Sequence, residues 1–164
     1  MGQSGQRPDR EIGSMERLPE KLQSLLDTMG SLQDQNHRIE MLLDFAARFK
    51  EVPPRVATRP FSEQNRVAFC ESEAYVWAEK QPDGTAKFHF AVENPSGISA
   101  KALAYILDRT LSGVPLEQLL GVKPDIVSTI FRQNISMGKG MGLMAMVQTV
   151  QKLARELMRE TAAR

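Results

Sequence analysis

Residues 74–92 read AYVWAEKQPDGTAKFHFAV, and this stretch decides the fold. Large apolar residues alternate with other residues in both of its halves, as Tyr75 and Trp77 do in the first. A period of two is typical of strands with one buried face. The residues 81–84 (QPDG) between the halves favour a tight turn, because proline presets one backbone angle and glycine accepts a positive one. The stretch therefore predicts a β-hairpin.

Helical periodicity flanks this hairpin on both sides. Two helices are predicted before it, over about 18–32 and 36–50, because apolar residues recur there every three or four positions. The segment 51–66 contains three prolines and is expected to form a loop. The segments predicted after the hairpin are a helix capped by Ser99 and ended by Gly113, a short segment opened by Pro115, a helix started by Pro124, and a last helix after the glycine-rich run 138–142.

The order of these elements predicts an α+β fold. Strands that cluster in the middle of a chain, rather than alternating with helices, favour a small antiparallel sheet with helices packed on one face. Val67 to Phe69 are expected to add a third strand to the hairpin. We expect a single domain over 15–164, with an N-terminal helix pair and C-terminal helices, after a disordered tail over 1–14.

The composition excludes several classes of protein. The chain has 164 residues, with 21 Lys and Arg against 20 Asp and Glu, so nothing in its charge indicates nucleic-acid or membrane-surface binding. One cysteine and two histidines exclude an intramolecular disulfide framework and a His-rich metal centre. No apolar stretch approaches the roughly 18 residues that span a bilayer. Without a signal peptide, an intracellular, cytoplasmic location is expected.

Cys70 is the first candidate for chemistry, because it lies where the long loop meets the hairpin. The alternative is a buried structural cysteine, which is the commoner fate of a lone thiol. Glu71 and Glu73 disfavour a thiolate, and no histidine is close in sequence, so a self-activated hydrolase nucleophile is poorly supported. His37 and His89 are each expected on a solvated face, with an approach to Cys70 as the alternative.

The run Gly138-Lys139-Gly140-Met141-Gly142 supports two interpretations. Backbone N–H groups at the start of a helix can hold an anion, but the run matches neither the phosphate loop nor the dinucleotide fingerprint. A flexible turn leading into a helix is therefore favoured. Met137 and Met141 are candidates for a contact surface, since methionine side chains adapt their shape to a partner, whereas Met146 is expected in the core.

Together these residues make the chain resemble the SufE family of sulfur acceptors, over about 36–153. The motifs that carry the resemblance are Cys70-Glu71-Ser72 followed by Val76-Trp77, Leu103 to Gly113 followed by Pro115, and Ile135-Ser136 leading to Gly142-Leu143. The chain departs from the common family pattern at three places. Phe69 takes the place of a glycine that usually precedes the cysteine. Val76 and Trp77 follow Cys70 by six and seven residues, where the family usually has four and five. Residues 136–139 read SMGK instead of SPSR.

The resemblance implies a sulfur-transfer protein that is not itself an enzyme. Cys70 would accept persulfide sulfur from a cysteine desulfurase of the SufS type, stimulate that enzyme, and pass the sulfur on to an iron–sulfur cluster scaffold. The chain would hold no cofactor, since the pyridoxal phosphate (PLP) belongs to the desulfurase. The residues expected to support Cys70 or to bind the partner are Glu71, Ser72, Trp77, Met137, Lys139 and Met141.

Other functions stay open on the sequence. The altered surroundings of Cys70 are compatible with a binding module that regulates a partner enzyme without carrying sulfur. A cysteine hydrolase is less well supported, because no histidine is placed with the thiol. A cluster-assembly scaffold is disfavoured too, since such proteins usually offer three cysteines and this chain has one.

Overall fold

The hairpin forms as the sequence predicts. In the computed structural model, which describes residues 17–163, β1 (Ala74–Lys80) pairs antiparallel with β2 (Ala86–Val92). The register places Ala74 opposite Val92 and Lys80 opposite Ala86. Gly84 adopts φ +86° in the connecting turn, a conformation that glycine accepts without steric cost.

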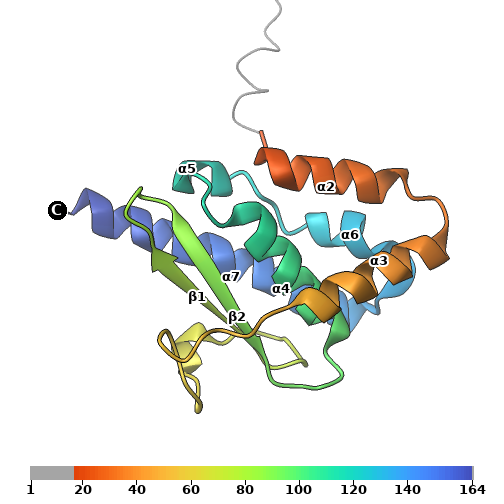
Figure 1. Ribbon diagram of the computed structural model, residues 1–164, viewed down its shortest axis with the longest axis horizontal. Helices are drawn as coiled ribbons and strands as arrows, with labels where there is room; N and C mark the ends of the chain where they lie inside the picture. The colour runs from red at the N-terminus through yellow and green to blue at the C-terminus, as the bar shows by residue number, and fades with distance from the viewer. Residues whose placement is uncertain (1–16, 164) are drawn as a thin grey trace, which may run out of the picture.

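Helices precede and follow the hairpin, which confirms the predicted α+β class (Figure 1). The predicted disordered tail, 1–14, lies outside the described residues. The helices are α2 (Glu20–Ser31), α3 (Gln35–Arg48), α4 (Ile98–Leu111), α5 (Leu116–Leu119), α6 (Ile126–Phe131) and α7 (Met137–Ala162), with short 3₁₀ turns η1 (Glu63–Asn65) and η2 (Arg132–Asn134).

The predicted third strand is wrong. Within residues 17–163, the sheet has two strands, and the segment before β1 adds only an isolated bridge between Arg66 and Tyr75. The Val67 amide donates a hydrogen bond to the Ala74 carbonyl at 2.8 Å. Pairing then stops, because Phe69 adopts φ +57°, a left-handed conformation that turns the chain out of the sheet.

One face of the hairpin packs on helices. Along each strand the side chains alternate between faces, so Val76 and its partner Phe90 point to the same side, where both are buried. In Figure 1, α7 crosses behind the hairpin and α4 lies beside it, and these two helices contact β1 and β2 respectively. Helices α2 and α3 pack on α4 from the other side. The main core lies between the hairpin and the helices.

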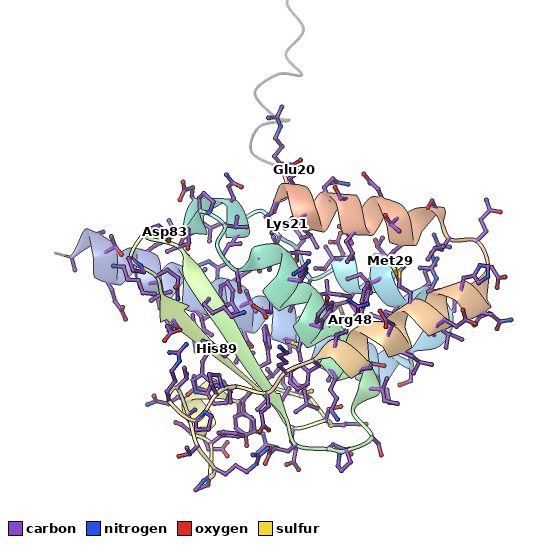
Figure 2. All side chains as sticks on the ribbon, viewed as in Figure 1. Glu20, Lys21, Met29, Arg48, Asp83 and His89 are labelled. Carbon is purple, nitrogen blue, oxygen red and sulfur yellow. The ribbon has the colours of Figure 1, made fainter. Side chains whose placement is uncertain are left out.

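The other face of the hairpin is covered by the loop that precedes it. Phe61 packs against Tyr75 and Trp77, with ring centroids 5.2 and 5.0 Å away. His89, labelled in Figure 2, is only 7% exposed, and its Nε2 lies 3.2 Å from a Glu79 carboxylate oxygen. The expectation that His89 is solvated is therefore wrong, because the loop shields a strand face that alternation alone assigns to water.

Two predicted helix starts are also wrong. Gly97, not Ser99, is the N-cap of α4. Helix α7 begins at Met137, with the Ser136 hydroxyl accepting a hydrogen bond from the Lys139 amide at 3.3 Å. The glycine-rich run therefore lies inside the first turns of α7 rather than in a loop before it, because the Ser136 cap offsets the weak helix propensity of glycine.

A buried arginine holds the segment that leads to α7. Arg38 is 2% exposed and donates hydrogen bonds to the carbonyls of Met29 (2.9 Å) and Leu32 (2.5 Å) at the end of α2. Arg132 donates to the Gly30 carbonyl of the same helix at 2.7 Å. Carbonyls at a helix C-terminus lack partners within the helix, so these guanidinium groups satisfy them. They thereby tie α2, α3 and the chain entering α7 together.

The covering loop is attached to the sheet by an ion pair that depends on pH. Arg55 donates hydrogen bonds to both Glu79 oxygens, at 2.5 and 3.1 Å. These bonds, followed by the contact with His89, lower the pKa of Glu79 from 4.5 to about 2. A carboxylate with a lowered folded-state pKa stabilises the fold fully above its unfolded-state pKa, and this contribution disappears as the pH falls through the folded-state pKa.

We therefore expect the urea midpoint of unfolding to fall as the pH is lowered from 4.5 to about 2, in part through Glu79. In E79Q, which cannot titrate at this position, the fall over the same range should be shallower. Urea titrations followed by circular dichroism at several pH values measure both slopes. Equal slopes in the two proteins would show that the ion pair does not contribute to folding.

Candidate functional site

Cys70 lies in a short loop whose two ends are fixed and whose middle is not. Residues 66–67 pair with β1 at one end, and at the other the Ser72 carbonyl accepts a hydrogen bond from the Asn94 amide at 3.1 Å. Within residues 17–163, the segment 68–71 makes one hydrogen bond, from the Glu73 amide to the Cys70 carbonyl at 3.1 Å. Few backbone hydrogen bonds are typical of a segment that opens easily.

The loop rests on α7 at a glycine. A Cβ atom added to Gly142 would lie 3.0 Å from the Cys70 Cα and 3.0 Å from the Phe69 carbonyl oxygen. A Cβ contact this close is unusually tight, so a side chain at this position would require the loop backbone to shift by a few tenths of an ångström. Gly97, the N-cap of α4, has the same role for the other end of the loop, since its Cβ would lie 3.1 Å from the Ser72 Cβ. Two glycines therefore hold the thiol between the starts of two helices.

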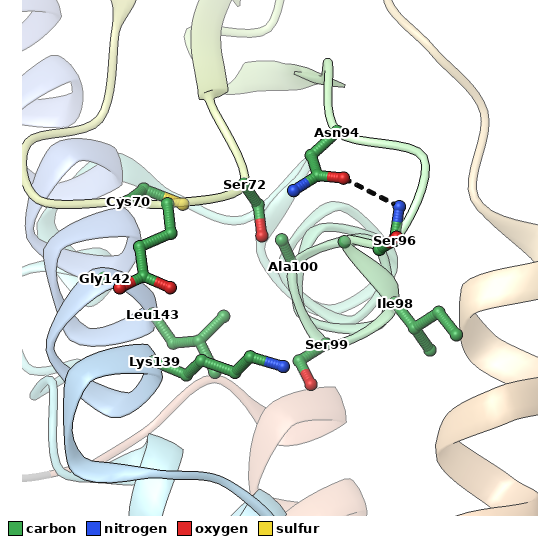
Figure 3. Close-up of a pocket in the computed structure, with 12 residues that line it drawn as sticks. Cys70, Ser72, Asn94, Ser96, Ile98, Ser99, Ala100, Lys139, Gly142 and Leu143 are labelled. Atoms are coloured by element: carbon green, nitrogen blue, oxygen red, sulfur yellow. Dashed lines mark hydrogen bonds between the residues drawn. The ribbon is translucent and has the colours of Figure 1, made fainter.

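A small cavity of about 90 Å³ opens beside the thiol (Figure 3). In Figure 3, Cys70 and Ser72 come from the loop, Lys139 and Leu143 come from α7, and the side chain of Lys139 extends toward Ser99 at the start of α4. The residues that line the cavity are Cys70, Glu71, Ser72, Asn94, Ser96, Gly97, Ile98, Ser99, Ala100, Lys139, Gly142 and Leu143. The half-buried thiol is thus enclosed on several sides without being sealed from solvent.

Two charged side chains flank the thiol. Glu71 places a carboxylate oxygen 4.0 Å from the Cβ position of Gly138, and so lies over the first turn of α7. A carboxylate is stabilised at a helix N-terminus, where the helix dipole is positive and N–H groups are free. Lys139 lines the cavity on the same helix. Glu71 can therefore hold the loop against α7, while Lys139 extends its side chain across the cavity toward α4.

The structure brings most of the predicted site residues together. Cys70, Glu71, Ser72 and Lys139 line one cavity. Trp77 is not among the lining residues; it packs with Phe61 and Tyr75 on the opposite face of the hairpin. Its supporting role stays a prediction, and any effect on Cys70 would be indirect, through the hairpin.

Met137 and Met141 lie on the first turns of α7, are not among the residues that line the cavity, and are exposed at 87% and 51% of their surface. Their predicted binding role stays a prediction. Phe69, which the sequence analysis places at the end of a third strand and notes as a departure from the family pattern, directly precedes Cys70 and is 79% exposed.

Sequence reasoning did not find the two glycines that shape the site. Gly97 is not singled out by the sequence analysis, which assigns Gly142 to a flexible turn. A signal was available for the second: Gly138 and Gly142 are four residues apart, so in a helix they share one face. Small residues at that spacing allow another backbone to approach the helix closely.

The arrangement suits thiol exchange better than hydrolysis. Within residues 17–163, no histidine lines the cavity, and its one carboxylate belongs to Glu71. In the same range, no three His, Cys, Asp and Glu side chains gather as a metal site. A thiol exchanging with a disulfide or persulfide needs access and the correct geometry, and its attacking group can be deprotonated without a dedicated base.

Comparisons with known proteins identify a family and a similar fold. The family model described as "SufE: Fe-S metabolism associated domain" matches residues 23–154. The chain is 27% identical over 148 residues to SufE-like protein 1, chloroplastic/mitochondrial, of Arabidopsis thaliana, covering 90% of this chain but 38% of that protein. The chain thus spans well under half the length of this relative.

The fold also matches a solved structure, the solution structure of a hypothetical protein from Thermus thermophilus. The TM-score is 0.69 at 26% identity, and the match covers 87% of this chain and 99% of that chain. Separately, no helix within residues 17–163 has the length and apolar character required to cross a membrane.

The left-handed backbone conformation at Phe69 can be tested by comparing the stabilities of two variants at this position. An L-residue in this conformation costs about 1–2 kcal/mol, whereas glycine adopts it freely and loses about 0.5–1 kcal/mol through its more flexible unfolded chain. We expect F69G to be more stable than F69A by about 1 kcal/mol, measured by urea unfolding. A more stable alanine variant would contradict the left-handed conformation, since alanine is favoured at ordinary positions.

The contact between the Cys70 loop and Gly142 can be tested by measuring how fast the Cys70 thiol is alkylated. G142A places a methyl group against backbone atoms of the loop, at 3.0 Å, and should push the loop away from α7. If opening becomes easier by about 1 kcal/mol, alkylation of Cys70 by iodoacetamide should accelerate about fivefold.

A matched control is available on α2. At Gly30 nothing lies within 4 Å of the added Cβ, so G30A should leave the alkylation rate unchanged. Because Cys70 is the sole cysteine, all labelling reports on it. Equal rates for G142A and the wild type would show that the Gly142 contact does not restrain the loop.

Proposed function

This chain belongs to the SufE family of Fe–S metabolism associated proteins, and from that premise we propose that Cys70 accepts persulfide sulfur from a PLP-dependent cysteine desulfurase. The observation that carries the proposal is the state of the thiol. Cys70 is half-buried on a four-residue segment, 68–71, that makes one hydrogen bond with the rest of the described chain. Such a thiol is sheltered at rest and released at low cost.

The transfer is a thiol–persulfide exchange. The Cys70 thiolate attacks the outer sulfur of the persulfide on the desulfurase, a new S–S bond forms at Cys70, and the S–S bond on the donor breaks. The donor cysteine leaves as a thiolate and takes up the proton that Cys70 released. One S–S bond replaces another, so the step consumes neither oxidant nor reductant.

The division of labour follows from this chemistry. Removing sulfur from free cysteine requires the PLP of the desulfurase, which remains in the partner. This chain holds no cofactor for the transfer and needs no catalytic base of its own. It stimulates the desulfurase by clearing the persulfide from its active site, and it acts as a carrier rather than as an enzyme.

The exchange requires the loop to leave α7. In the closed arrangement the Cys70 backbone lies against Gly142, and the cavity wall on one side of the thiol is α4. An attacking sulfur must approach the persulfide in line with the breaking S–S bond, which a donor on another protein cannot present inside a cavity of about 90 Å³. Loop extension delivers the thiol, and closure afterwards protects the persulfide from oxidants.

The partners and compartment follow from the same proposal. A cysteine desulfurase of the SufS type supplies the sulfur, and an iron–sulfur cluster scaffold receives it. A single unpaired thiol functions in a reducing compartment, for which we propose the cytoplasm.

The proposal is tested by intact-mass spectrometry. The wild-type protein is incubated with a PLP-dependent cysteine desulfurase from the same organism and with cysteine. We expect a gain of ~32 Da, one sulfur atom, that dithiothreitol removes. C70S should show no gain. A wild-type protein that never gains this mass would overturn the carrier role.

A second readout separates a carrier from a regulatory binding module. The rate of alanine release by the desulfurase should rise when the wild-type protein is added, and the rise should be lost with C70S. A module that regulates without carrying sulfur would keep the stimulation in C70S. Circular dichroism confirms that both proteins are equally folded.

A further inference from the structure

Phe69 is the one phenylalanine that lies outside the apolar clusters of the fold. The chain has seven phenylalanines. Six of them belong to one of the two apolar clusters: Phe45, Phe49, Phe61, Phe88, Phe90 and Phe131. Phe69 belongs to neither and is 79% exposed. Most of the ring therefore lies outside the packing of the described part of the protein.

The backbone at Phe69 is also unfavourable for this side chain. Its φ of +57° lies in the left-handed region, where a large side chain is an outlier and glycine is preferred. Glycine at this position would make the same turn and expose no ring to water. A strained backbone and an exposed ring are both unfavourable in the free protein, so any benefit arises in a complex.

Two other exposed apolar side chains lie on the first turns of α7, the helix against which the Cys70 loop rests. Met141 precedes Gly142, the residue on which Cys70 rests, and Met137 lies one helical turn earlier on the same face of α7. Phe69, Met137 and Met141 are exposed at 79%, 87% and 51% of their surface. Unbranched methionines fill irregular surfaces, and an aromatic ring is a common anchor at interfaces.

We propose that Phe69 is the anchor by which the carrier loop recognises the desulfurase, its ring inserting into an apolar recess beside the partner's persulfide, with the exposed Met137 and Met141 of α7 contacting the same partner. The inference rests on the proposed function. If Cys70 meets the persulfide of the partner, the residue bonded to Cys70 must lie in that interface, within the reach of one peptide unit. The recess is apolar because the phenyl ring offers no hydrogen bond.

The anchor also explains how a released loop finds its orientation. Segment 68–71 has almost no hydrogen bonds of its own to guide it. A ring fixed in a recess would restrict the adjacent Cys70 to one side of the partner's active-site entrance. Ordering a loop by one rigid aromatic side chain loses little side-chain entropy, since phenylalanine has two rotatable bonds.

The test compares binding with chemistry in the same variants. Affinity for the PLP-loaded desulfurase, without cysteine, is measured by calorimetry. F69A should raise the Kd at least tenfold, roughly the loss seen when a buried aromatic anchor is truncated, and the conservative F69Y should keep most of the affinity. The M137A/M141A double variant should raise Kd by about threefold. L43A, which truncates a residue that is 48% exposed on α3, should leave the Kd unchanged.

A small donor separates docking from thiol reactivity. Glutathione persulfide needs no recess for a ring, so its rate of sulfur transfer to Cys70 should be the same in F69A and in the wild type. F69G, which relieves the strained backbone, should bind as weakly as F69A, and this result would exclude a folding defect as the cause of weak binding.

Each other outcome overturns the proposal. If F69A binds the desulfurase as tightly as the wild type, Phe69 is not an anchor. The carrier function would still be supported in that case if wild-type Cys70 accepts sulfur. An F69A equally slow with the small donor would mean that the residue acts on the thiol itself. If analytical ultracentrifugation shows that the wild type is a dimer and F69A is a monomer, the ring binds a second copy of this chain instead of the desulfurase. A wild-type protein that does not bind the desulfurase overturns both proposals together.

Discussion

The site depends on one close approach, between the backbone of the Cys70 loop and helix α7 at Gly142. A methyl group at this position would lie 3.0 Å from loop backbone atoms, so the approach as it stands depends on the absence of a side chain at residue 142. The contact keeps the thiol half-buried, yet the segment it restrains makes a single hydrogen bond within the described chain. Packing without hydrogen bonding is a weak restraint, and a weak restraint suits a group that must be sheltered and then released.

The rest of the fold serves to place that contact. The hairpin fixes both ends of the loop, and the Ser136 cap starts α7 early enough for Gly142 to face it. The arginines at the end of α2, Arg38 and Arg132, hold the chain that enters α7. Hydrogen-bonded elements surround a short segment with few hydrogen bonds of its own, which is a common arrangement of functional loops.

Much of this architecture could be predicted from the sequence, because it follows local rules. The hairpin at 74–92 combined strand periodicity with a turn of proline and glycine, and the helices showed their period of three to four. The resemblance to the SufE family pointed to Cys70. What could not be predicted depends on contacts between distant segments: the loop over His89, the early start of α7, and the approach of Gly142 to a cysteine 72 residues earlier (142 minus 70). Alternation alone does not reveal whether a loop covers a strand face.

The most direct test of the account is the structure of the complex in which Cys70 is joined by a disulfide to the catalytic cysteine of the desulfurase. This bond stands in for the exchange intermediate, in which a sulfur links the two proteins. The account predicts that Cys70 has left Gly142 in this complex, that residues 68–71 are extended, and that the hairpin and α7 are unchanged. A linked complex in which the Cys70 backbone still rests on Gly142 would contradict it.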